Sequence, residues 1–274
     1  MAESRSRQTF RGGGLKCNVI ENSFRNALTR MTKDGGRRIA TSTGAMLADP
    51  ASLGNLLETA GEALFDPDYW LGRGELAAVN GGRGAAWFVG VGAEQWVLRH
   101  FRRGGNVARL SKDAYIWAGE TRVRAFAEWR LLALLCLRGL PVPQPIAARY
   151  RRTGFIYRCD LITRRIADAQ PLSAALAASC ILEPTWRAIG AGIARLHGAG
   201  VDHADLNAHN ILLSAQGGVS VIDFDRSRLR APGAWRQRNL ARLRRSLDKV
   251  SRDLPRERFS GAEWDWLLSG YRSG

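Results

Sequence analysis

One stretch constrains the fold of this chain more than any other: His203–Leu213, with the sequence HADLNAHNILL. Polar groups crowd its first eight positions, and the apolar run Ile211–Leu213 follows at once. A second short run, GVSVIDFD, begins with glycine and ends on acidic side chains. Two short apolar runs around a turn predict a β-hairpin. We therefore expect the polar residues on both sides of this hairpin to lie near one another.

The spacing of these polar residues resembles that of the protein-kinase catalytic loop. His203, Asp205 and Asn210 follow H-x-D-x-x-x-x-N, and Asp223 comes thirteen residues after Asn210. An aspartate can accept the proton of an acceptor hydroxyl, and amide and carboxylate oxygens are hard ligands for the Mg²⁺ that accompanies ATP. We predict Asp205 as the base and Asn210 and Asp223 as metal ligands. Each residue alone would be explained better by a role in a turn.

His203 is better suited to holding the loop by hydrogen bonds than to transferring protons. The histidines of the chain do not stand at zinc-site spacing beside cysteines or clustered carboxylates. A histidine metal site is therefore not expected.

The N-terminal half has the pattern of a small β-rich lobe. Residues 75–101 read as strands around a glycine cluster. Residues 120–138 place apolar side chains at helical spacing before a Gly and a Pro. Two further runs, 141–150 and 154–163, read as strands. We expect a mostly antiparallel five-stranded sheet with one long helix.

After residue 163 the pattern becomes mainly helical, with helices expected over 183–196, 236–250 and about 262–268. The predicted fold class is α+β and protein-kinase-like, with a small antiparallel β lobe carrying one long helix and a larger, mainly helical lobe. The predicted domains are a flexible basic extension, an ATP-binding lobe, and a lobe with the catalytic loop and acceptor contacts: residues 1–40, 41–163 and 164–274.

Arg99 and Glu128 are the candidates for ATP contacts in the small lobe. The strand period in QWVLRHF places Arg99 on one face with Val97 and Phe101, so this cation needs an anionic partner. Arg99 occupies the place of the lysine in the kinase V-A-I-K strand, although its planar fork binds phosphate differently. Glu128 lies on an apolar helical stripe, where an unpaired carboxylate is costly. The alternative is an exposed Arg99, with Glu128 paired to Arg124 one turn earlier.

Two other features of the small lobe leave alternatives open. Lys112 is the only lysine of residues 41–163 and could contact the phosphates instead of Arg99. The glycines Gly81, Gly82 and Gly84 could approach the phosphates closely, but an ordinary hairpin turn explains them equally well. No G-x-x-x-x-G-K-[ST] is present, which disfavours a P-loop enzyme.

Several separate segments occur in the order typical of one family: FDPDYW, GRGAAWF, VLRHFRRGG, GLPVPQPIAARY, DLITRRI, HADLNAHNILL and VIDFDRSRLR. Over about residues 46–271 the chain resembles the 3-deoxy-D-manno-octulosonic acid (Kdo) kinases of lipopolysaccharide assembly. The resemblance implies transfer of the γ-phosphate of ATP to the 4-hydroxyl of Kdo on lipid IVA, with Asp205 as acid/base. It places Asn207 where protein kinases have their catalytic-loop lysine. Asp225 replaces the glycine of D-F-G, which argues against activation-loop switching.

The net charge of +16 favours an anionic partner. Kdo-lipid IVA and the inner-membrane surface are both anionic, and one helical stripe carries four basic residues: Arg238, Arg242, Arg245 and Lys249. This stripe would contact headgroups or simply be a solvated helix face. No apolar run approaches the roughly 20 residues of a membrane span, and the N-terminus lacks the apolar core of a secretion signal. We expect a peripheral protein on the cytoplasmic face of the bacterial inner membrane.

Two alternative functions remain open. The same fold could phosphorylate another lipopolysaccharide sugar, such as a heptose, or a small alcohol. A non-catalytic basic protein that binds membranes or nucleic acid would also explain the charge. The set Asp205, Asn210 and Asp223 argues against a pseudokinase, and without a recognised DNA- or RNA-binding motif no nucleic-acid partner is expected.

Overall fold

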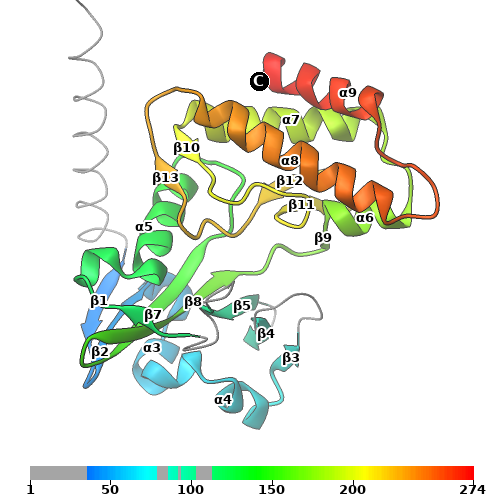
Figure 1. Ribbon diagram of the computed structural model, residues 1–274. Helices are drawn as coiled ribbons and strands as arrows, with labels where there is room; N and C mark the ends of the chain where they lie inside the picture. Colours follow the sequence, from blue (N-terminus) through cyan, green and yellow to red (C-terminus); the bar gives the residue numbers. More distant parts are fainter. Residues whose placement is uncertain (1–35, 79–85, 92–93, 103–112) are drawn as a thin grey trace, which may run out of the picture.

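An antiparallel sheet forms the N-terminal part of the molecule (Figure 1). The computed structural model describes residues 36–78, 86–91, 94–102 and 113–274. In spatial order the paired strands are β1 (Arg37–Ala40), β2 (Gly44–Ala48), β7 (Pro145–Thr153), β8 (Ile156–Arg164), β5 (Glu94–His100), β4 (Ala86–Val91) and β3 (Leu76–Ala78). A short strand, β6 (Tyr115–Ile116), also pairs with β8. The pairing of β5 with β8 places Arg99 opposite Leu161, in the middle of the sheet.

The sheet is larger than the sequence pattern predicted, because β1, β2 and β6 add to the five expected strands. The predicted extension over residues 1–40 ends too late, since Arg37–Ala40 is a strand paired with β2. Residues 1–35 lie outside the described residues. β1 is rich in arginine, and β2 is almost wholly buried, so neither shows the alternation by which a half-buried strand is recognised.

Two boundaries also differ from the prediction. The long helix α5 spans Arg124–Leu137 and is preceded by a separate 3₁₀ turn, η3 (Glu120–Arg122), because Val123 adopts an extended backbone. The strand expected from residue 141 begins at Pro145. Prolines 141 and 143 precede it, and proline has no N–H to donate to a sheet.

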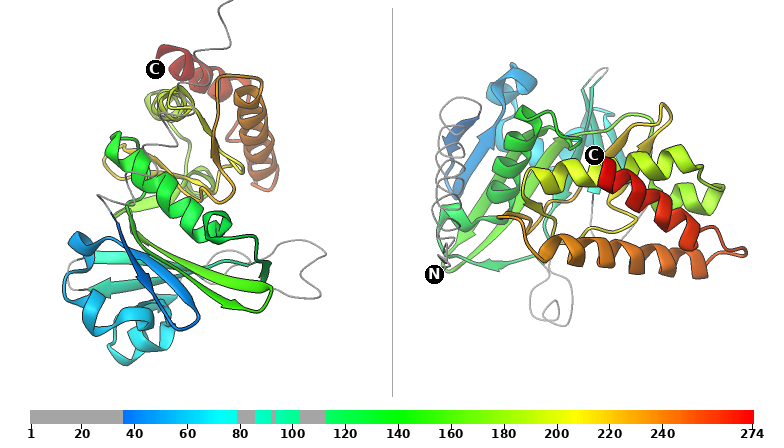
Figure 2. Two further views of the ribbon diagram at one scale, coloured as in Figure 1. Left: turned by 90° about the vertical axis from the view of Figure 1, so that its left-hand side faces the viewer. Right: turned by 90° about the horizontal axis from the view of Figure 1, so that it is seen from above.

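The two faces of the sheet are covered by different helices. Helix α5 packs on one face, where Phe126 and Leu132 meet Ala148 and Leu161 in a continuous core (Figure 2, left). Leu98 and its neighbours on the opposite face pack under short helical segments that the sequence pattern did not place: α2 (Pro50–Leu53), α3 (Leu56–Thr59), η1 (Gly61–Phe65) and α4 (Pro67–Gly72). Because strand side chains alternate, Arg99 lies on the α5 side.

The C-terminal part is mainly helical. Its helices are α6 (Leu172–Ala178), α7 (Glu183–Gly198), α8 (Trp235–Arg252) and α9 (Gly261–Ser273). Short strands lie between them and the sheet: β9 (Ala169–Pro171), β11 (Ile211–Ser214) and β12 (Val219–Val221) in one ribbon, and β10 (Val201–Asp202) with β13 (Arg228–Leu229) in another. The predicted hairpin is β11–β12, with Ile211 opposite Val221.

Helices α7 and α9 cross closely because glycines stand at the contact. A Cβ atom at Gly190 would lie 2.0 Å from the carbonyl oxygen of Leu267, and one at Gly270 would lie 2.0 Å from that of Arg187. α9 runs to Ser273, several residues beyond the predicted end, and starts with a capping box between Ser260 and Glu263.

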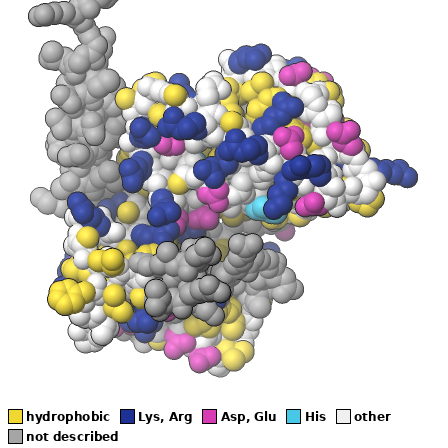
Figure 3. Space-filling model, viewed as in Figure 1, with side chains coloured by type: hydrophobic (Ala, Val, Ile, Leu, Met, Phe, Trp, Pro, Cys, Tyr) yellow, Lys and Arg dark blue, Asp and Glu magenta, His cyan; other side chains and the backbone are white. Residues whose placement is uncertain are grey.

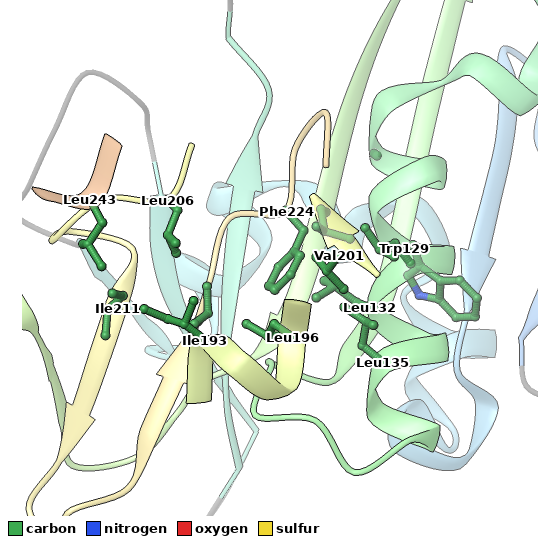
Figure 4. Close-up of a cluster of buried hydrophobic side chains, with 14 of the residues drawn as sticks. Trp129, Leu132, Leu135, Ile193, Leu196, Val201, Leu206, Ile211, Phe224 and Leu243 are labelled. Carbon is green, nitrogen blue, oxygen red and sulfur yellow. The ribbon is translucent and has the colours of Figure 1, made fainter. Parts of the chain in front are cut away.

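One hydrophobic core joins the sheet part to the helical part. Leu132 and Leu135 of α5 lie beside Leu196, near the end of α7, and Val201 of β10, with Phe224 next to them (Figure 4). All five are almost fully buried. This continuity fixes α5 and the segments around β11 and β12 relative to each other.

Candidate active site

Arg99 lies at the centre of a three-residue charge cluster. Its two terminal nitrogens donate to different carboxylates, one on Glu128 of α5 and one on Asp223 after β12. Its guanidinium also stacks over Phe101, which lies on the same strand face. The predicted pair of Arg99 and Glu128 is therefore present, and the alternative pairing of Glu128 with Arg124 is not.

Glu128 is buried and uses both carboxylate oxygens. One accepts from Arg99, and the other accepts from the backbone N–H of Phe224 at 3.1 Å. Burial raises the pKa of Glu128 to about 7, and the adjacent Arg99 opposes that rise. The carboxylate thus holds the residue after Asp223 by its main chain, which joins α5 directly to this segment.

The turn after β12 aims two carboxylates in different directions. Asp223 has a φ of 62°, in the left-handed region, where aspartate is among the residues better tolerated. Burial tends to raise the pKa of Asp223, but the charge and the hydrogen bond of Arg99, with smaller contributions from His203 and a backbone N–H, together outweigh it, and the pKa lies below its ordinary value. Asp225 turns the other way and forms a fork with Arg124, the first residue of α5, in which Arg124 Nε donates to Oδ1 at 2.8 Å.

Asp205 and Asn210 lie on a loop that is held by its own side chains. Asn210 Nδ2 donates to the carbonyl of Asp205 at 2.9 Å, which leaves its Oδ1 as the atom for another partner. Asn207 Oδ1 accepts the backbone N–H groups of His209 and Asn210, while its Nδ2 also donates to the carbonyl of Asp205. The Asp205 side chain is 56% exposed. Asn207 thus shapes the loop, and the carboxylate of Asp205 faces solvent.

His203 fixes the loop to the strand beside it. Its Nε2 donates to the carbonyl of Ile222 at 3.1 Å, and its Nδ1 accepts the N–H of Asp205 at 3.2 Å. Its ring packs against Phe224. Burial lowers the pKa of His203, so the ring is neutral at pH 7 with the proton on Nε2. Through its hydrogen bonds to Ile222 and Asp205, His203 fixes the position of Asp205 relative to Asp223.

The side-chain oxygen atoms of Asn210 and Asp223 are suitable ligands for Mg²⁺. The two residues flank the β11–β12 hairpin, and the N–H of Ile222 donates to the carbonyl of Asn210 at 2.9 Å. An amide oxygen and a carboxylate are hard ligands, and Mg²⁺ is commonly held by one or two such groups together with phosphates. Within the described residues no group of three or more His, Cys, Asp or Glu is placed to hold a metal. The pair therefore fits a metal completed by a nucleotide better than a protein-only cage.

Helix α8 supports the loop with two residues that the sequence analysis did not single out. Asn239 accepts the N–H of His203 and donates to Asp202, both at 3.0 Å. Ser246 Oγ accepts the N–H of Ala208 at 3.1 Å. A signal for Asn239 was available, because it falls on the same helical stripe as buried leucines, where an amide needs partners. No sequence signal pointed to Ser246.

The remaining predicted site residues were the small-lobe glycines and one lysine. Gly81, Gly82, Gly84 and Lys112 lie outside the described residues. Arg124 entered the sequence analysis only as an alternative partner for Glu128. Its contact with Asp225 joins residues far apart in the sequence and follows from the fold alone.

Comparison with known proteins identifies the family of this chain. The profile of the lipopolysaccharide kinase (Kdo/WaaP) family matches residues 68–271. This chain belongs to that family. The match starts later than the resemblance expected from about residue 46, and ends where it was expected.

Curated relatives carry a more specific name, 3-deoxy-D-manno-octulosonic acid kinase. One from Xanthomonas campestris pv. campestris (strain B100) is 48% identical over 202 residues, which cover 73% of this chain and 80% of the relative. One from Xylella fastidiosa (strain 9a5c) is 48% identical over 188 residues, 68% of this chain and 75% of the relative. One from Stenotrophomonas maltophilia (strain K279a) is 47% identical over 195 residues, 71% and 78% respectively. In the described part of this family member, no helix has the length and apolar character to cross a membrane.

Proposed function

We propose that this family member is a Kdo kinase, which transfers the γ-phosphate of ATP to the 4-hydroxyl of Kdo in Kdo-lipid IVA during assembly of the lipopolysaccharide core. One observation carries the proposal. A hydrogen bond joins Asp205 and Asn210 within one loop, and His203 attaches this loop to Ile222, the residue before Asp223. This arrangement occurs in a chain that is 48% identical to proteins named for this activity.

The fold supports a protein-kinase-like arrangement of two lobes. The sheet with α5 takes the part of the small lobe, and the segment from β9 to α9 takes the part of the large lobe. Arg99 and Glu128 hold the positions of the strand lysine and helix glutamate in that template. Arg99 uses its planar fork to bridge two carboxylates, and its remaining N–H groups can donate to ATP phosphates.

The residues of the site divide the reaction between them. Asp205 accepts the proton of the acceptor hydroxyl as that oxygen forms its bond to the γ-phosphorus and the bond to the β-phosphate oxygen breaks. Asn210 Oδ1 and the carboxylate of Asp223 would hold Mg²⁺, which when bound would supply positive charge against the ATP phosphates. His203 and Asn207 hold the loop so that Asp205 faces the acceptor side.

The protein would work as a peripheral protein at the cytoplasmic face of the inner membrane. Lys and Arg side chains gather over the face of the helical part that carries α8 (Figure 3). The basic residues of the α8 stripe are all exposed: Arg238, Arg242, Arg245 and Lys249. Each basic residue near an anionic surface contributes about 1 kcal/mol to binding.

An acceptor assay tests the proposal directly. Purified protein with Mg-ATP should add the mass of one phosphate to Kdo-lipid IVA, and tandem mass spectrometry should place it at the 4-hydroxyl of Kdo. Lipid IVA without Kdo, a heptose-bearing acceptor and a small alcohol complete the panel. Phosphate on the heptose acceptor alone, or on none of them, would refute the proposed function.

A further inference from the structure

We propose that Arg242 of α8 selects the acceptor by binding a carboxylate on the same sugar that carries the reacting hydroxyl. The inference rests on the proposed function and assigns the residue that recognises the acid group of its acceptor. Arg242 Nη1 lies 3.4 Å from Oδ1 of Asp205, across the exposed side of the 203–210 loop.

The position of Arg242 is set by hydrogen bonds on either side of it. Asn239, Arg242 and Ser246 stand at i, i+3 and i+7, so they share one face of α8. Asn239 binds His203 and Asp202, and Ser246 binds Ala208. These anchors attach the helix to both ends of the loop and place Arg242 between them, over Asp205.

The contact between Arg242 and Asp205 is too exposed to serve the fold. The two side chains are 48% and 56% exposed, and the separation of 3.4 Å lies at the long end for a hydrogen bond. Exposed pairs of this kind add little to stability. Arg242 can therefore turn from Asp205 toward an incoming anion without cost to the fold.

The short distance between Arg242 and Asp205 limits which anion Arg242 can bind. Asp205 must touch the acceptor hydroxyl, so a group held by Arg242 lies within one sugar ring of that hydroxyl. The sugar named in the close relatives is an octulosonic acid, so it carries its own carboxylate. The phosphates of the acceptor belong to its lipid part instead. A guanidinium fork matches a carboxylate bidentately, and it also offsets the repulsion between that carboxylate and Asp205.

Four kinetic measurements test the assignment. The wild-type protein and Arg242→Gln are each assayed with Kdo-lipid IVA and with the same acceptor whose Kdo carboxyl has been converted to an amide. We expect wild-type kcat/KM to fall about 10- to 100-fold with the amide, the usual range for one charge-assisted contact. Arg242→Gln should lose a similar factor with the acid, mainly as a higher KM for acceptor, and should no longer distinguish acid from amide.

Three controls distinguish the loss of the Arg242 contact from general effects of a substitution. Arg272→Gln removes an exposed arginine of α9, a helix that packs on α7 rather than on the loop, and should keep the wild-type preference. Arg242→Lys should recover part of the preference, because it restores the charge but not the fork. The KM for ATP should stay unchanged in all variants.

An Arg242→Gln variant that loses the same factor with both acceptors would overturn the assignment, as would a wild-type protein that ignores the amide change. Failure of the proposed function looks different, because the wild-type protein would then phosphorylate neither acceptor. Thermal melting of Arg242→Gln within about 2 °C of wild type separates a binding defect from a folding defect.

Discussion

At the residue scale, Arg99 shows why an arginine can replace the lysine of the kinase strand. One guanidinium reaches Glu128 with one nitrogen and Asp223 with the other. A lysine ammonium is a single point charge and could not hold both carboxylates at fixed angles. The arginine thus couples α5 to the turn after β12 through one side chain.

Asp205 gives the first prediction. Asp205→Ala should lower kcat about 10²- to 10⁴-fold, the usual contribution of a general base. Its melting temperature should stay near wild type, because the side chain is half exposed and its contact with Arg242 is a surface one. Steady-state kinetics and thermal melting check both expectations.

Asp265→Ala, an exposed aspartate of α9, is the matched control and should keep wild-type kinetics. A near-normal kcat for Asp205→Ala would remove Asp205 from the proposed role.

At the element scale, helix α5 is attached to the turn after β12 at two positions along its length. Glu128 holds the main chain of Phe224 from the middle of the helix. Arg124 holds Asp225 from the first residue, and its guanidinium also stacks on Tyr115. A glycine at position 225, as in D-F-G, would lack the second attachment. The aspartate therefore joins the first residue of α5 directly to the turn after β12.

The second prediction measures this attachment. Asp225→Asn and Arg124→Gln should each lower the free energy of unfolding by about 1–3 kcal/mol, because each leaves a half-buried charge without its partner. Both should also lower kcat. In the double variant the losses should not add, with a coupling energy of about 1–2 kcal/mol.

Urea unfolding of the four proteins gives the coupling energy. The exposed pair of Glu183 and Arg187, one helical turn apart, is the reference cycle and should couple by only about 0.3–0.5 kcal/mol. Additive losses for Arg124 and Asp225 would mean that the fork does not hold α5.

At the scale of the whole molecule, His197 joins three helices of the C-terminal part. It lies in α7, donates from Nε2 to Asn239 of α8 and accepts the hydroxyl of Tyr271 of α9. Burial lowers the pKa of His197 to about 4. The folded protein therefore holds this ring neutral, whereas the unfolded chain protonates it near its ordinary pKa of about 6.5.

The third prediction follows from that difference. Above about pH 6.5 both states hold the ring neutral, so its contribution to stability is complete. As the pH falls from about 6.5 to 4 the unfolded state binds a proton that the folded state does not, and about 3 kcal/mol of stability is lost. In His197→Gln, the loss of unfolding free energy over this range should be smaller by about that amount. Equal pH dependence in the two proteins would contradict the neutral, buried ring.

The fourth prediction concerns the net charge of +16. If the α8 stripe meets anionic headgroups, the triple variant Arg238→Gln, Arg245→Gln, Lys249→Gln should bind anionic vesicles about 100-fold more weakly, at about 1 kcal/mol per charge. Cosedimentation at fixed salt measures the affinity.

The control triple Arg37→Gln, Arg122→Gln, Arg272→Gln has the same net charge and changes exposed arginines outside α8. It should bind nearly as well as wild type. Retention on duplex DNA but not on vesicles at matched salt would favour a nucleic-acid partner instead.

The sequence by itself determined the order of the longer elements and the identity of the polar groups. Local patterns can be recognised without knowledge of the fold. They include the H-x-D-x-x-x-x-N spacing, the hairpin before Asp223 and the charged Arg99 inside an apolar strand. Periodicity missed β1, β2 and the short helices between residues 50 and 72, because short or fully buried segments carry no clear period.

Only the tertiary structure decided which groups meet. Arg99 with Asp223, Arg124 with Asp225, and Arg242 with Asp205 are separated by 124, 101 and 37 residues in the chain. A long side chain on a helix can reach several neighbours, so its partner depends on how the helices pack, to within a few ångströms. Burial then determines how much an ion pair contributes to stability. A pair on an exposed loop adds little, whereas a buried pair is costly to break.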